Sequence, residues 1–175
     1  MTIKNFILAL GLALSVASSF AEPINTVVTL TPNVAVPGSY TAEFGATHQF
    51  AGSFTDTFIF VPLLSGLVDS GIFTISHSPS SNINFVSAFI NGNPFTLSPN
   101  GIMETAFTIP LNLTAPIELV VHGIAGPDLP VGTSLAASYS GTINIQNAQK
   151  VPEPASLALL GLGLLGFAAT RRRKQ

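Results

Sequence analysis

Apolar and polar residues alternate in short runs through the middle of this chain, between residues 22 and 150. Thr, Val, Ile and Phe are frequent in these runs, which eleven prolines and eleven glycines interrupt. A two-residue period with frequent turn formers is typical of β-strands, and no run shows a convincing helical period. The predicted strands are 24–30, 40–47, 49–61, 71–76, 83–90, 94–97, 104–109, 117–124 and 134–145. Their spacing predicts one all-β domain, a sandwich or jelly roll.

Asn91-Gly92 stands between two of these predicted strands, 83–90 and 94–97. Both residue types tolerate the positive φ that a two-residue reversal requires. The pair therefore predicts a β-hairpin.

One predicted strand places a carboxylate in a row of aromatic side chains. Because alternate residues of a strand share a face, one face holds Phe54, Asp56, Phe58 and Phe60. A buried, unpaired carboxylate is strongly unfavourable, so Asp56 needs partners. We expect a structural carboxylate that accepts hydrogen bonds from loop N–H groups or from hydroxyls such as those of Thr55 and Thr57. The alternative is a ligand site, in which Asp56 binds sugar hydroxyls or Ca²⁺ beside a Phe ring.

The two ends of the chain have the composition of targeting segments. Residues 1–21 contain Lys4, an apolar run over 6–14, and small side chains at Ser19 and Ala21. This arrangement predicts a secretory signal peptide, cleaved between Ala21 and Glu22. The exported domain then spans residues 22–150.

Residues 155–170 are apolar or small throughout and predict a short C-terminal transmembrane helix. The four cations that follow form a basic stop-transfer signal: Arg171, Arg172, Arg173 and Lys174. They place the tail, 171–175, in the cytoplasm and the domain outside it.

Pro152, Glu153 and Pro154 precede this apolar segment. Together with the Gly/Leu-rich residues 157–167 and the terminal cations, they resemble the PEP-CTERM sorting signal, which would span 151–175. The resemblance implies that an exosortase, a membrane-embedded transpeptidase, processes this chain. It also implies a Gram-negative source that makes extracellular polysaccharide, and a destination at the cell surface or in a biofilm matrix.

The F-x-D-x-F pattern of residues 54–58, continued by Phe60, is similar to the motif of the FxDxF subfamily of PEP-CTERM proteins, and Tyr139-Ser140-Gly141 is similar to a second segment of it. This likeness implies a class and a destination, without a molecular activity.

Charge and composition exclude several functions for residues 22–150. These residues include seven acids and one cation, Lys150, so their net charge is −6. A negative charge argues against binding nucleic acid. The chain has no cysteine, so it has no thiol for a lipid anchor, a nucleophile or a zinc site. The three histidines, His48, His77 and His122, lack metal-ligand spacing, and we expect each at the surface or in a turn. We predict no catalytic residue, metal or cofactor.

These observations predict a non-enzymatic exported protein, held by its tail and then sorted to the surface or secreted, with a structural or adhesive role. The alternatives are a carbohydrate- or calcium-binding module and, third, a matrix polysaccharide hydrolase. The hydrolase would need two carboxylates about 5–10 Å apart.

Overall fold

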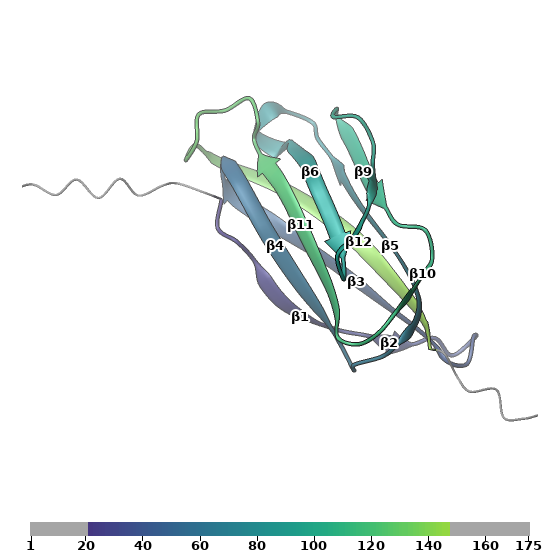
Figure 1. Cartoon of the computed structure of the whole chain (residues 1–175). Coiled ribbons are helices and arrows are strands. Elements are labelled where there is room, and N and C mark those ends of the chain that lie inside the picture. Colours follow the sequence, from purple (N-terminus) through teal and green to yellow (C-terminus); the bar gives the residue numbers. More distant parts are fainter. Residues whose placement is uncertain (1–20, 148–175) are drawn as a thin grey trace, which may run out of the picture.

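The structure is a computed structural model, and it describes residues 21–147. Two β-sheets pack face to face with the core between them (Figure 1). One short 3₁₀-helix, η1 (Pro79–Ser81), is the only helical element among the described residues. The all-β prediction is therefore confirmed, and a two-sheet sandwich is its natural description.

The first sheet has five strands in the order β1-β4-β11-β6-β7. Its strands are β1 (Asn25–Thr29), β4 (Gly52–Val61), β6 (Ile83–Ile90), β7 (Asn93–Pro94) and β11 (Ile117–Ala125). The edge strand β1 runs parallel to β4, and the other pairs are antiparallel.

The second sheet has seven strands in the order β2-β3-β12-β5-β9-β8, with β10 also paired to β5. Its strands are β2 (Thr31–Pro32), β3 (Ser39–Phe50), β5 (Gly66–Ile75), β8 (Thr96–Leu97), β9 (Met103–Phe107), β10 (Leu111–Leu113) and β12 (Ser134–Asn147). The longest, β12, lies between β3 and β5 and is the centre of this sheet.

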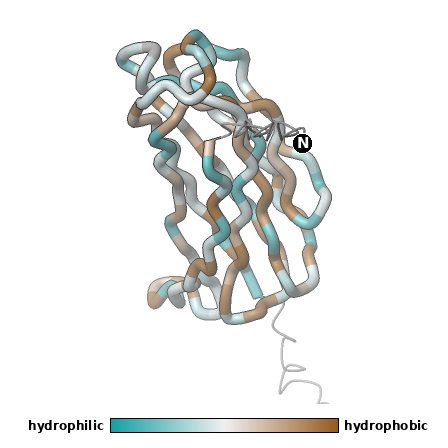
Figure 2. The backbone as a smooth tube through the Cα atoms, turned by 90° about the vertical axis from the view of Figure 1, so that its left-hand side faces the viewer, coloured by the Kyte–Doolittle hydropathy of each residue, from teal (hydrophilic) through white to brown (hydrophobic). Residues whose placement is uncertain are grey.

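The two-residue period of the sequence has a direct structural counterpart. Buried positions alternate with exposed or half-buried ones along β3, β4, β11 and β12. Figure 2 shows hydrophilic and hydrophobic segments following one another along the backbone. Aromatic rings fill much of the space between the sheets: Phe44 of β3 lies 4.9 Å from Phe58 of β4, measured between ring centroids. Burial of such large apolar side chains is the main source of stability in a domain without disulfides.

Several sequence predictions match the structure closely. Strand 83–90 is observed with the same bounds as β6. The Asn91-Gly92 hairpin is confirmed, with φ of 45° and 78° at the two residues.

Other boundaries were wrong. The predicted break at His48 lies instead at Ala51, because His48 continues the buried face of β3 and the chain reverses at Gly52, where φ is 151°. Strand β5 begins at Gly66, before the predicted residue 71, since Leu67 and Val68 pair with the unpredicted strand β10. The predicted strand 94–97 is divided between the two sheets as β7 and β8.

The predicted signal peptide, transmembrane segment and basic tail lie outside the described residues, apart from Ala21. Within residues 21–147, we find no helix with the length and apolar character that a membrane crossing requires.

Replacing Phe58 with Ala should lower the free energy of unfolding by about 3–5 kcal/mol, because the ring is fully buried and its loss leaves a cavity. The neighbouring Ile59 faces the opposite side of the sheet and is 38% exposed, so Ile59→Ala should cost less than half as much. Urea unfolding of the two variants measures both values. Equal losses would contradict the assignment of the core face.

Candidate functional site

The carboxylate of Asp56 lies in the centre of the sandwich, with none of its surface exposed. It projects inward from β4, in the same row as Phe54, Phe58 and Phe60, so the predicted aromatic face is confirmed. Thr55 and Ile59 of the same strand face outward.

Three donors from separate parts of the chain satisfy this carboxylate. The Tyr139 hydroxyl of β12 donates to Oδ2 at 2.7 Å, and His48 Nε2 of β3 lies 3.0 Å from the same oxygen. The backbone N–H of Ile24 donates to Oδ1 at 2.9 Å. For His48 to donate to the carboxylate, its proton must lie on Nε2. The arrangement joins β4 of the first sheet to β3 and β12 of the second.

Aromatic side chains enclose these polar groups. The His48 ring stacks on Phe54, with centroids 3.9 Å apart, and Tyr139 meets Phe58 and Phe85 edge-on. Burial, followed by the charge of Asp56 and the hydrogen bond to it, raises the pKa of Tyr139 well above its usual range. The folded domain therefore favours the neutral phenol, which donates to Asp56.

The expectation that loop N–H groups or hydroxyls would satisfy Asp56 is confirmed by Ile24 and Tyr139, but two details of the hydrogen-bonded group around Asp56 were wrong. Thr55 and Thr57 are not the partners of Asp56, because neighbours in a strand point to the opposite face. His48 is buried rather than at the surface or in a turn. His77 is exposed as predicted, and His122 is half-buried on the outer side of β11, bonded to Thr55.

A second buried carboxylate, Glu104 of β9, was missed by the sequence analysis. Its Oε2 accepts from the N–H of Phe85 at 2.8 Å and its Oε1 from the N–H of Gly101 at 3.0 Å. The alternation of Glu104 with the small apolar Ala106 was the available signal, because it places both on the inner face. Like Asp56, Glu104 holds backbone segments together.

The closed environment of Asp56 favours the structural interpretation over the ligand site, since neither a sugar nor Ca²⁺ reaches a fully buried carboxylate with three protein donors. Among residues 21–147, His, Asp and Glu side chains form no group of three able to hold a metal ion.

His77 and Asp128 line one cavity of about 500 Å³ at a loop end of the sandwich.

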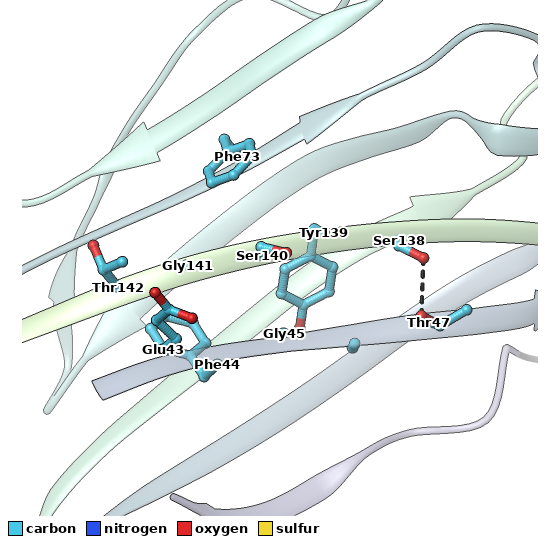
Figure 3. A pocket seen from close by; sticks show the side chains of 11 residues that line it. Glu43, Phe44, Gly45, Thr47, Phe73, Ser138, Tyr139, Ser140, Gly141 and Thr142 are labelled. Atoms are coloured by element: carbon cyan, nitrogen blue, oxygen red, sulfur yellow. Dashed lines mark hydrogen bonds between the residues drawn. The ribbon is translucent and has the colours of Figure 1, made fainter. Parts of the chain in front are cut away.

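A larger hollow lies on the outer face of the seven-stranded sheet, and we call it the outer trough. Its volume is about 590 Å³, and it is an open depression rather than an enclosed cavity. The side chains that line it come from β3, β12 and β5 and are Glu43, Thr47, Ser138, Ser140, Thr142 and Phe73, with Gly45 between them (Figure 3).

The fold and the buried cluster define a β-sandwich domain whose inner acids are structural. Residues 150–174, directly after this domain, match the PEP-CTERM protein-sorting motif. The predicted sorting signal is thus found, and it implies an exported protein that an exosortase sorts. The match covers the C-terminal segment alone, so it concerns the sorting of the chain and gives no information on the function of the domain.

Among solved structures, the chain is similar to PliG of Aeromonas hydrophila, a periplasmic inhibitor of g-type lysozyme. The two share 15% identity with a TM-score of 0.34, over 71% of this chain and 100% of that one. This likeness is too distant to carry an argument. No curated protein matches the chain in sequence.

Replacing Asp56 with Ala should lower the free energy of unfolding by about 3–5 kcal/mol, since it leaves the buried His48 and Tyr139 donors and the half-buried Ile24 N–H without an acceptor. Asp128→Ala, at an exposed turn position, is the matched control and should change it by less than about 0.5 kcal/mol. Urea unfolding at neutral pH makes the comparison. A loss of less than about 1 kcal/mol in the Asp56 variant would contradict the proposed importance of the cluster.

The raised pKa of Tyr139 predicts alkaline destabilisation. An unfolded tyrosine ionises near pH 10, whereas folded Tyr139 keeps its proton, so the stabilisation is complete below that pH and declines above it. The free energy of unfolding should fall by about 1.4 kcal/mol per pH unit above pH 10 through this one group. Tyr139→Phe should lack this slope and Tyr40→Phe should keep it. Tyrosinate absorbance from both tyrosines in the folded protein would refute the prediction.

Proposed function

We propose that this protein is a non-enzymatic component of the cell surface or extracellular matrix, with a structural or adhesive role. A signal peptide exports it, the C-terminal helix holds it in the membrane with its domain outside the cytoplasm, and an exosortase then releases or attaches it. The sorting motif at residues 150–174 carries this proposal. The similarity of the segments around Asp56 and Tyr139 supports placing the chain in the FxDxF subfamily.

The position of the domain supports the proposal. The last strand, β12, ends at Asn147, so only residues 148 and 149 separate the folded domain from the motif. The two ends of the described chain lie at opposite ends of the sandwich (Figure 1). An anchored domain of this shape points its N-terminal end and the loops beside it away from the sorting signal.

The burial of two of the seven acids supports a non-enzymatic role over the hydrolase alternative. Asp56 and Glu104 are committed to hydrogen bonds inside the core. The outer trough contains a single carboxylate, Glu43, whereas glycoside hydrolysis by the usual route requires two.

Changing Pro152, Glu153 and Pro154 together to Ala should block processing, because the exosortase would no longer recognise the tail. Intact mass and cell fractionation should show a membrane-bound precursor, as in cells that lack the exosortase. Gln175→Ala, outside the matched residues, is the control and should be processed normally. Processing that continues in the triple variant, or in cells without the enzyme, would overturn the proposed sorting.

A further inference from the structure

The outer trough exists because small residues occupy the middle of three neighbouring strands. Gly45 of β3 pairs with Ser140 of β12, and Gly71 of β5 pairs with Thr142. No large side chain rises from these four positions. A Cβ at Gly45 would lie 2.5 Å from the Tyr139 carbonyl oxygen, so close approach of β3 and β12 also requires a glycine there. The floor of the trough is therefore built into the strand pairing.

One side of the trough is apolar and aromatic. Phe73 of β5 lines the trough and is 47% exposed, and Phe107, which lies outside the lining on the next strand, β9, is 50% exposed. Phe107 pairs with Gly71, two residues before Phe73, so the two rings belong to adjacent outward positions. These two exposed rings form an apolar surface beside the hollow, which a ligand with an apolar face would cover.

The other side is polar and rich in hydroxyl groups. Thr47 and Ser138 are hydrogen-bonded to each other at 2.8 Å, and Ser140, Thr142 and Glu43 continue the row (Figure 3). These groups are exposed and both donate and accept hydrogen bonds, with Glu43 as an acceptor. A ligand that fits must therefore combine an apolar face with an edge of hydroxyl groups.

A pyranose ring has this combination, since its C–H groups form an apolar face and its hydroxyls project from the edge. We propose that the outer trough binds a segment of a neutral polysaccharide, with one sugar ring against Phe73 and its hydroxyls toward the row of Glu43, Ser140 and Thr142. The volume of about 590 Å³ suits a few sugar units. An open trough admits an internal stretch of a long chain.

The negative charge of this face favours a neutral polysaccharide over an acidic one. Residues 21–147 contain no Lys or Arg, and Glu43 and Asp69 lie on outward positions of the strands that form this face. Uronic acid, phosphate or sulfate groups would meet carboxylates and no cation, which is unfavourable for binding. The same argument excludes an anionic membrane surface as the occupant.

The experiment uses the full chain, purified in detergent, and measures its retardation in native gels that contain polysaccharide. The probes are the neutral and acidic fractions of the extracellular polysaccharide of the producing cells, and defined neutral glucans, mannans and xylans. Phe73→Ala removes the apolar side of the trough, and Ser140→Leu fills its floor. Phe50→Ala is the matched control, because Phe50 is 50% exposed and does not line the trough.

We expect at least one neutral polysaccharide to bind, and each trough variant to weaken that binding about tenfold or more. Phe50→Ala should bind as the wild type does, and all variants should unfold at similar urea concentrations because each substituted position is exposed. The proposal would be overturned if no neutral polymer bound, or if the acidic fraction bound more strongly. It would also be overturned if binding survived in both trough variants. Self-association that Phe73→Ala abolishes, without polysaccharide binding, would assign the trough to a second copy of the chain and also overturn it.

This inference rests on the proposed function only for the presence of extracellular polymers, which export brings within reach. The gel measurement needs no sorting step, so a failure of binding and a failure of exosortase processing are separate results.

Discussion

The hydrogen-bonded carboxylate of Asp56 is the constraint on which the rest of this sandwich depends. A charged group in an aromatic core is tolerated only when donors satisfy it fully. Here the donors come from β3, β12 and the segment before β1, and the acceptor from β4. The carboxylate therefore fixes how the two sheets face each other. A one-residue slip of β4 would turn Asp56 to the solvent and leave His48 and Tyr139 without a partner, so the cluster specifies register as well as stability.

The hydrogen-bonded group around Asp56 and the outer trough lie on opposite faces of the same strand, β12. Along β12, Tyr139 points inward to Asp56, Ser140 points outward into the trough, and Gly141 is again buried. A side chain at Gly141 would collide with the Phe44 ring, whose terminal carbon would lie 2.5 Å from the added Cβ. The Tyr-Ser-Gly order thus serves the core, the surface and sheet packing in three successive residues.

The sequence was sufficient to predict the fold class and the residues on the inner face of β4, because both follow from a two-residue period of apolar positions. It was insufficient for the partners of Asp56, which lie 8, 32 and 83 residues away along the chain. Such long-range pairings are set by sheet order, and no local pattern encodes them. The expectation for Thr55 and Thr57 failed because adjacent residues of a strand diverge, and His48 was misplaced because its burial depends on a partner that only the fold supplies. The trough was not foreseen for the same reason, since its floor is made of small residues on three strands.

The distribution of charge connects the core to the surface. Residues 21–147 contain no Lys or Arg to pair with their acids, so Asp56 and Glu104 are held by N–H, hydroxyl and imidazole donors. The remaining acids keep the surface negative, which favours solubility and disfavours acidic polymers. Strand β12 then leads from this surface toward the sorting motif: Asn147 lies seven positions after Ser140, a length of about 23 Å in an extended strand. The outer trough, which we propose as the binding face, therefore lies on the flank of the sheet, away from the end of β12 that the sorting motif follows.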